Sequence, residues 1–324
     1  MDNNFEQLLE KAKNRIENKF VYFEESGRFS WLYPFTTENI KGYINQFDLR
    51  NKSLLTVGSS GDQVINASLK GCKDQTILDI CPYTKYYFYL KKAALLTLSY
   101  EEFINFFCFL DYTETFNDNY QVFNIDTYKK IRLNLKELNE EAFMFWDELF
   151  NTYYGLDIRV SLFKKDETSF KSLKRMNLYL SSEDLFNKSK VNIKEVNTKF
   201  LTGDIFKLKL KLNRIYNNIF LSNLCTYYSV SDLKKLVESL NNNLSLNGSM
   251  LIAYLYDTKR DTKYKKNWKE IYDLDKTLKI FSNYNIDFES FVGTKGLDFE
   301  NENIKDSIIV YRKRGNNNAR IRKI

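Results

Sequence analysis

Short apolar runs and longer amphipathic stretches alternate along much of the chain. The short runs, which are typical of strands in a buried sheet, lie at 54–57, 76–80, 191–201, 218–224, 249–256, 286–292 and 307–312. The amphipathic stretches, which are typical of helices, lie at 4–19, 62–70, 82–98 and 231–240. Because strands that alternate with helices build parallel sheets, we predict an α/β fold with a mostly parallel sheet of about seven strands and helices on both faces.

Two regions depart from this alternation. Residues 20–35 are rich in aromatic side chains, and a capped helix start follows at Thr36. Residues 99–190 consist of aromatic and charged helical segments with few strand-like runs, which indicates a helical insertion. The aromatic stretch 29–35 and the insertion are equally compatible with a lid over a ligand and with ordinary core packing.

The turn after the first predicted strand is rich in glycine and serine. It reads Gly58, Ser59, Ser60, Gly61, and Asp62 then opens the next helix, where it also suits a helix cap. Asp79 ends the second strand, where a carboxylate can accept hydrogen bonds from ribose hydroxyls. This order is typical of the first half of a nucleotide-binding βαβ unit, although a plain tight turn also uses glycine.

The chain contains no histidine, and this excludes several kinds of site. Ser-His-Asp and Cys-His catalysis and His-ligated metals are all impossible, so proton transfer must use carboxylates, tyrosines, lysines or water. The four cysteines have no Cys-x-x-Cys spacing, and we expect ordinary buried thiols. We therefore predict no metal site.

The formal net charge is +7, and part of it lies in the basic tail 314–324. Such a tail either keeps the chain soluble or contacts RNA or an anionic membrane surface. No run reaches the roughly 18 to 20 apolar residues that span a bilayer, and the first residues lack the basic and apolar regions of a secretory signal. We expect a cytoplasmic protein.

Three further polar residues complete a series of candidate ligand contacts at strand ends. Asp204 follows the third strand, and Ser222 and Asn223 end the fourth. In this order of elements the chain resembles the class I S-adenosylmethionine-dependent transferases from about residue 40 to 313. The resemblance implies a Rossmann-like fold in which the glycine loop, with Gly58 and Gly61, packs against the methionine part of the cofactor.

The same resemblance assigns roles to the remaining candidates. It implies that Asp79 binds the ribose hydroxyls, that Asp204 meets the adenine amine, and that Ser222 and Asn223 border the reacting centre. The loop departs from the family pattern because it lacks an acid at its start and a third glycine. Three residues could substitute at the amino-acid end of the cofactor, namely Ser59, Ser60 and Asp62.

A closer resemblance is to the betaine-lipid synthase-like 3-amino-3-carboxypropyl transferases (the DUF3419-like group). It rests on Thr56-Val-Gly-Ser-Ser-Gly-Asp-Gln-Val64, on Leu78-Asp-Ile-Cys-Pro82 and on Tyr89-Leu-Lys-Lys-Ala-Ala-Leu-Leu-Thr-Leu-Ser-Tyr-Glu-Glu-Phe103. Cys81 stands where the group has Asn, and Lys85 where it usually has Gln. The resemblance implies transfer of the 3-amino-3-carboxypropyl group of S-adenosylmethionine, with a small molecule or a lipid headgroup as acceptor.

Both methyl and aminocarboxypropyl transfer are in-line displacements at carbon, which depend mainly on positioning and desolvation. Neither needs histidine, and a carboxylate or a phenol suffices where a base is required. Tyr227 and Tyr228 follow the fourth strand and are the catalytic candidates, although both could be ordinary aromatic packing residues.

These observations predict an S-adenosylmethionine-dependent transferase that moves a methyl or a 3-amino-3-carboxypropyl group. The alternative is a non-catalytic protein that retains the fold and holds the nucleoside. A nicotinamide-dependent oxidoreductase is disfavoured because the loop lacks the G-x-G-x-x-G spacing for a pyrophosphate. We predict an N-terminal segment at 1–50, a Rossmann-like cofactor-binding domain at 51–98 and 191–313, a helical insertion at 99–190 and the tail at 314–324.

Overall fold

The computed structural model describes residues 3–18, 31–108, 121–164, 170–208, 212–222, 224, 228–256, 286–292 and 305–313. Within these residues seven strands form one sheet in the order β3-β2-β1-β4-β5-β7-β6. The strands are β1 Ser53–Val57, β2 Asp74–Asp79, β3 Asn197–Thr202, β4 Tyr216–Phe220, β5 Leu244–Tyr256, β6 Ile286–Val292 and β7 Lys305–Arg312. Strands β1 to β5 pair in parallel, and β7 is antiparallel to both β5 and β6. The predicted α/β fold with a mostly parallel sheet is confirmed.

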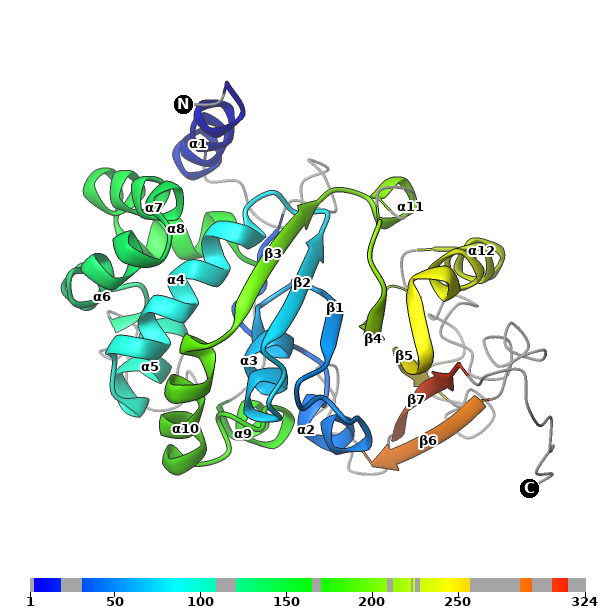
Figure 1. The fold of residues 1–324 in the computed structure, drawn as a ribbon. Helices are drawn as coiled ribbons and strands as arrows, with labels where there is room; N and C mark the ends of the chain where they lie inside the picture. Colours follow the sequence, from blue (N-terminus) through cyan, green and yellow to red (C-terminus); the bar gives the residue numbers. More distant parts are fainter. Residues whose placement is uncertain are drawn as a thin grey trace.

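Twelve α-helices lie within the described residues (Figure 1). They are α1 Asn3–Glu17, α2 Ile40–Tyr43, α3 Asp62–Leu69, α4 Thr84–Thr97, α5 Tyr100–Phe107, α6 Ile125–Leu138, α7 Glu140–Thr152, α8 Gly155–Leu162, α9 Phe170–Met176, α10 Glu183–Lys194, α11 Ile205–Leu208 and α12 Val230–Leu240. Seven of them, α4 to α10, lie between β2 and β3, and none of the described residues there forms a strand. The domain boundaries that we predict from the sequence stay a prediction.

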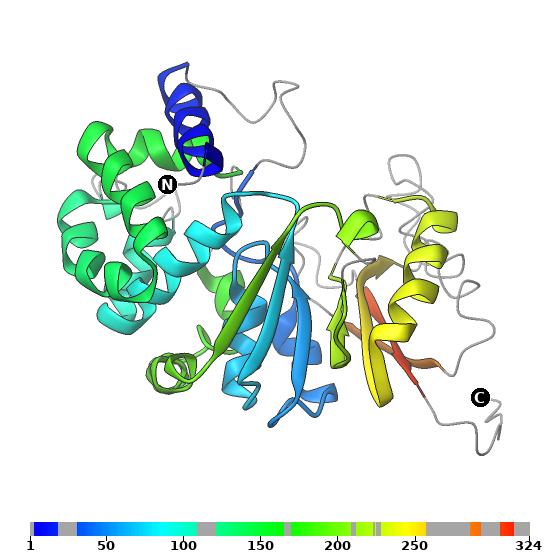
Figure 2. The same ribbon diagram turned by 45° about the horizontal axis from the view of Figure 1, so that its top comes forward.

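Successive residues of each strand lie on opposite faces of the sheet and pack against different helices. Leu54 and Phe220 contact the layer that contains α2, whereas Leu55 and Ile219 contact the layer that contains α12. In Figure 2 α12 lies on the opposite side of the sheet from α3. Because successive strand residues point to opposite faces, a strand covered on both sides must be apolar throughout. This explains the continuous apolar runs of the sequence.

Three predicted boundaries differ from the structure. The strand expected at 191–201 begins only at Asn197, because 191–194 are the last turn of α10, which Ser182 caps by accepting the Leu185 N–H at 3.2 Å. The fourth strand ends at Phe220 rather than at 224, and the fifth begins at Leu244 rather than at 249. The remaining strands lie within two residues of their expected places.

The chain between β1 and β4 determines where a site can form. From β1 it runs outward to β2 and β3, and it then crosses back so that β4 pairs with the other side of β1. In open α/β sheets ligands bind beyond the carboxyl ends of the strands at such a reversal of strand order. The carboxyl ends of β1, β2 and β4 are therefore the place to look for a site.

The helical side packs around α4, with α1 seated beside α7 and α8 (Figures 1 and 2). No described helix is both long and apolar enough to span a membrane. Several predictions fall outside the described residues: the tail 314–324, most of the aromatic stretch 20–35, Asn223 and Tyr227.

Candidate functional site

A cavity lies at the carboxyl ends of β1, β2, β3 and β4. The described residues that line it are Trp31, Tyr33, Thr36, Thr37, Glu38, Val57, Ser59, Ser60, Gln63, Leu78, Asp79, Ile80, Cys81, Gly203, Ile205, Ser222, Leu224 and Tyr228. Five sequence-predicted site residues are therefore brought together in one wall, namely Ser59, Ser60, Asp79, Ser222 and Tyr228. Gly58, Gly61, Asp62 and Asp204 are not among the lining residues.

The two glycines of the loop are needed for the backbone rather than for direct contact with the cavity. A Cβ on Gly58 would lie 2.6 Å from Cγ2 of Thr84 and 3.1 Å from Oδ2 of Asp79, so a side chain has no room there. Gly61 has φ +78°, a conformation that glycine adopts without strain, and it precedes the first residue of α3. Together they place Ser59 and Ser60 in the cavity wall.

Asp79 is held by backbone donors from both sides. Its Oδ2 accepts the Ser59 N–H at 2.5 Å, and its Oδ1 accepts the Cys81 N–H at 2.8 Å. Burial raises the pKa of the Asp79 carboxyl, and the N–H groups of Cys81 and Ser59 oppose this by lowering it. The carboxylate is thus rigidly oriented at the end of β2, where ribose hydroxyls could donate to it.

Asp62 has a structural role that its position in the sequence did not reveal. Its side chain is fully buried and pairs with Lys91 at 2.5 Å. Its oxygens also accept the hydroxyl of Tyr179 at 2.7 Å, the N–H of Thr36 at 2.6 Å and the hydroxyl of Ser60 at 2.9 Å. Four protein donors therefore occupy this carboxylate, and the contact between Asp62 and a ligand stays a prediction.

Asp204 and Tyr228 form one unit beyond β3. The Tyr228 hydroxyl donates to Oδ1 of Asp204 at 3.2 Å, and the same oxygen accepts the N–H of Phe206 at 2.9 Å. Burial and the negative charge of Asp204 raise the pKa of Tyr228. Tyr228 thus acts as a hydrogen-bond donor to Asp204, and its catalytic role stays a prediction.

Ser222 lies just beyond β4, and a residue that the sequence analysis missed holds it. Its φ is +53°, and its hydroxyl donates to the carboxylate of Glu38. Glu38 is only 3% exposed and also accepts the hydroxyl of Tyr43 at 2.9 Å and the side-chain N–H of Gln63 at 2.8 Å. The sequence offered no signal for this contact, because 184 residues separate Glu38 from Ser222.

The segment before α2 supplies a further part of the cavity wall, for which the sequence analysis left a lid and ordinary core packing open. Trp31 and Tyr33 come from the aromatic stretch, and Thr36 and Thr37 come from the predicted helix start. The backbone of Leu32 fixes this segment, since its N–H donates to Leu162 at 3.0 Å. Two aromatic residues of the stretch 29–35, Trp31 and Tyr33, therefore line the cavity.

Among the described residues, the cavity wall supplies no thiolate and no cluster of side chains suits a metal ion. Burial and the neighbouring charge of Asp79 raise the pKa of the Cys81 thiol to about 12, so it is protonated at neutral pH. Cys72, Cys81 and Cys108 are buried free thiols as expected, while Cys225 lies outside the described residues. No three of the described Cys, Asp and Glu side chains form a group that could hold a metal ion.

The charges of the wall contrast with those of the whole chain. Among the described lining residues, Glu38 and Asp79 are acids and none is Lys or Arg, although the chain carries a formal net charge of +7. The surroundings of the cavity therefore favour a ligand that carries positive charge or donates hydrogen bonds over one that carries phosphates.

No protein-family model matches the sequence, and no curated protein matches it. Solved structures match its fold at low identity. The N-methyltransferase NodS from Bradyrhizobium japonicum, in complex with S-adenosylhomocysteine, is 7% identical over 94% of this chain and 97% of that chain, with a TM-score of 0.39. The magnesium protoporphyrin IX methyltransferase from Synechocystis PCC 6803, with bound S-adenosylhomocysteine, is 9% identical over 85% and 79%, with a TM-score of 0.38.

A Streptococcus mutans protein assigned as an S-adenosylmethionine-dependent methyltransferase is 10% identical over 84% of this chain, with a TM-score of 0.39. The present chain spans 47% of the length of that protein. At these identities the likeness concerns the fold alone. The structure is thus similar to S-adenosylmethionine-dependent methyltransferases of the class I fold.

Proposed function

We propose that this chain is an S-adenosylmethionine-dependent transferase that moves a methyl or a 3-amino-3-carboxypropyl group to a nucleophile. The observation that carries the proposal is the cavity at the reversal of strand order, whose wall combines the glycine loop, the Asp79 carboxylate and Ser222. Asp79 accepts the ribose hydroxyls of the cofactor, and the sulfonium lies toward β4. This arrangement uses the carboxyl ends of the strands as α/β ligand sites do.

The charge of the wall supports a sulfonium cofactor over a dinucleotide. S-adenosylmethionine carries positive charge on its sulfonium and on its ammonium group, and the carboxylates of Glu38 and Asp79 give the partly desolvated wall a negative charge that stabilises such a ligand. A pyrophosphate instead requires cations or free N–H groups, and the described wall contains no Lys or Arg.

The proposed transfer depends on how the cofactor and the nucleophile are positioned rather than on an activated side chain. Displacement at a carbon next to the sulfonium needs the nucleophile in line with the breaking bond, and it needs water kept out. Trp31, Ile80 and Leu224 supply apolar surface for that purpose. Tyr228, which lines the cavity, donates a hydrogen bond to Asp204 and so positions that carboxylate, which does not line the cavity itself.

The sequence resemblance to betaine-lipid synthase-like proteins motivates the finer part of the proposal. On this reading the transferred group is 3-amino-3-carboxypropyl, and the acceptor is a small molecule or a lipid headgroup. The basic tail 314–324 would then bring the chain to an anionic membrane surface, or to RNA if the acceptor is a nucleotide. Methyl transfer uses the same cofactor pose with a different carbon in line.

Calorimetric titration with S-adenosylmethionine tests the proposal. We expect saturable binding that Asp79→Asn weakens by roughly tenfold to a hundredfold, the worth of a hydrogen bond to a charged group. Asp74→Asn is the matched control, because Asp74 begins the same strand and pairs with Arg214 at 2.9 Å. This control should bind the cofactor as the wild type does. No binding at millimolar cofactor would contradict the proposal.

The product then identifies the group that moves. With candidate acceptors present, S-adenosylhomocysteine as the by-product indicates methyl transfer, and methylthioadenosine indicates aminocarboxypropyl transfer. Binding without either product, across nucleophiles of several classes, would favour a non-catalytic protein that holds the nucleoside.

A further inference from the structure

We propose that Glu38 binds the ammonium group of the aminocarboxypropyl arm of the cofactor. This inference rests on the proposed function, because it assumes S-adenosylmethionine in the cavity. It assigns a cofactor-binding role to a residue of the segment before α2, far in sequence from the glycine loop.

The geometry of Glu38 suits a fixed recognition group. Its side chain is buried, lines the cavity and takes hydrogen bonds on both oxygens. Ser222 donates to Oε1, while Tyr43 and Gln63 donate to Oε2 at 2.9 and 2.8 Å. Donors from three separate elements therefore orient the carboxylate, so little entropy remains to be lost when a ligand binds.

The order of the strands places the two acids of the wall on opposite sides of β1. Asp79 ends β2, which pairs with one edge of β1, and Ser222 follows β4, which pairs with the other edge. A nucleoside whose ribose is held by Asp79 extends its 5′ substituent along the glycine loop toward β4. The end of that substituent then lies beside Glu38.

The chemistry of the arm selects the group that Glu38 contacts. An ionised carboxylate only accepts hydrogen bonds, so its partner must donate them. The sulfonium has no N–H or O–H, and the carboxylate of the arm would be repelled. The ammonium is the one group of the arm that both donates hydrogen bonds and carries positive charge.

The test compares three ligands on Glu38→Gln, a variant that keeps the shape of the side chain. S-Adenosylmethionine and S-adenosylhomocysteine both carry the arm, whereas 5′-methylthioadenosine lacks it. We expect the variant to bind the first two roughly tenfold to a hundredfold more weakly, as for loss of a charge-assisted hydrogen bond. Its affinity for 5′-methylthioadenosine should be unchanged, which also shows that the cavity has kept its fold.

Three other results would overturn the inference. Loss of affinity for all three ligands would mean that Glu38 only holds Ser222 and the wall in place. Loss for S-adenosylmethionine but not for S-adenosylhomocysteine would mean that Glu38 responds to the sulfonium charge. Unchanged affinity for all three, with loss of turnover, would assign Glu38 to the acceptor.

Two controls separate this inference from the proposed function. Glu195→Gln makes the same substitution at an exposed carboxylate that pairs with Lys73 at 2.5 Å and does not line the cavity. It should keep the wild-type preference for ligands that carry the arm. Asp79→Asn should weaken all three ligands alike, because all contain the ribose. A wild-type protein that binds none of the three would contradict the proposed function itself.

Discussion

Two serines in the cavity wall adopt a backbone conformation that residues with a Cβ rarely adopt. Ser59 has φ +42° and Ser222 has φ +53°. Each is tied to an acid of the wall, since the Ser59 N–H donates to Asp79 and the Ser222 hydroxyl donates to Glu38. A left-handed residue costs about 1–2 kcal/mol, so these hydrogen bonds offset a strain that turns both serines into the cavity. Such strain is concentrated at functional sites.

The raised pKa of Asp79 predicts how cofactor affinity depends on pH. The ionised carboxylate accepts ribose hydroxyls on both oxygens, whereas the protonated form loses part of that capacity. Since burial raises the pKa of Asp79, we expect affinity for S-adenosylmethionine to fall as pH decreases, starting at a higher pH than an ordinary Asp with a pKa of about 3.9 would give. Calorimetric titration across a pH series measures this.

The expected loss of affinity at low pH cannot come from unfolding driven by Asp79, because the raised pKa of this carboxyl has the opposite effect on stability. A raised pKa means that the folded state binds the proton more tightly than the unfolded state does. The contribution of this carboxyl to stability is therefore present at low pH and is lost as pH rises through the folded pKa. Asp79→Asn should bind weakly with no pH dependence over that interval. An identical pH profile in wild type and variant would contradict the prediction.

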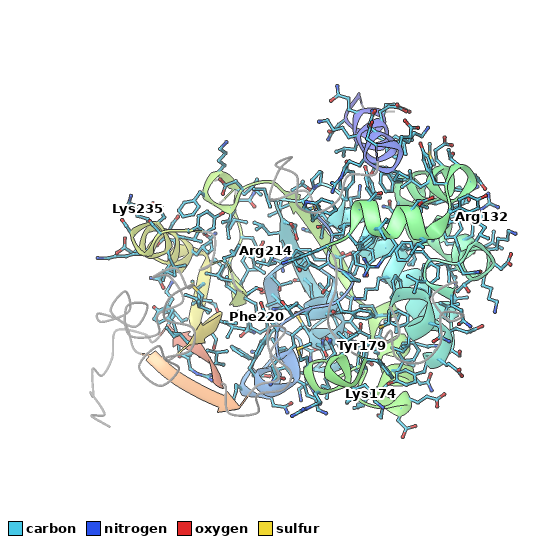
Figure 3. All side chains as sticks on the ribbon, turned by 180° about the vertical axis from the view of Figure 1, so that it is seen from behind. Arg132, Lys174, Tyr179, Arg214, Phe220 and Lys235 are labelled. Atoms are coloured by element: carbon cyan, nitrogen blue, oxygen red, sulfur yellow. The ribbon has the colours of Figure 1, made fainter. Side chains whose placement is uncertain are left out.

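At the scale of elements, one buried ion pair joins the parts that surround the loop. Lys91 of α4 pairs with Asp62 of α3 and donates to the carbonyls of Pro34 at 2.8 Å and Ser60 at 3.0 Å. Its ammonium also lies 4.2 Å from the ring centre of Phe35. Tyr179, on the helical side of the molecule in Figure 3, joins the same carboxylate. Residues of the N-terminal segment and of the helical side therefore fix the glycine loop together.

Removing Lys91 should therefore cost much more than removing a neighbouring lysine of the same helix. Lys91→Met leaves the buried Asp62 charge without its ammonium, and we expect a loss of about 3–5 kcal/mol in the free energy of unfolding. Lys85→Met breaks a pair with Glu141 in which both side chains are about a third exposed, and we expect a loss of at most about 1 kcal/mol. Urea unfolding of the two variants measures the difference. Equal losses would show that the buried pair contributes no more than a surface pair.

The sheet could be predicted from the sequence because strands covered on both faces are apolar throughout. Runs such as 54–57 stand out against the helices, and they were placed closely. The strand at 191–201 was placed too early because Val191 and Ile193 suit a strand as well as a helix. Their exposed fractions, 63% and 0%, show that they lie on opposite faces of α10. In the sequence, only the helix cap Ser182, nine residues before Val191, distinguishes a helix from a strand here.

The site was less accessible to sequence reasoning than the sheet. Residues that follow strands, such as Asp79 and Ser222, could be placed because strand ends meet at one edge. Glu38 could not, because its contact with Ser222 depends on tertiary packing of the segment before β1. The pairing of Asp62 could not be predicted for the same reason, since its partner Lys91 lies on another helix and carries no mark in the sequence.

At the scale of the whole molecule, the cavity is acidic although the chain is basic. Comparing which ligands stabilise the protein therefore tests the proposed cofactor. Ligand binding to the native state alone stabilises it by RT ln(1 + [L]/Kd), about 2.7 kcal/mol at a hundredfold excess over Kd. For a chain of this size we expect S-adenosylmethionine at that excess to raise Tm by roughly 5 °C. NAD at the same concentration should leave Tm unchanged, because its pyrophosphate would face Glu38 and Asp79 with no Lys or Arg among the described lining residues. Both ligands contain adenine and ribose, so an equal rise with both would show that the wall recognises only the nucleoside. A rise with NAD alone would show that the wall prefers a pyrophosphate. Either result would remove the charge argument for a sulfonium cofactor.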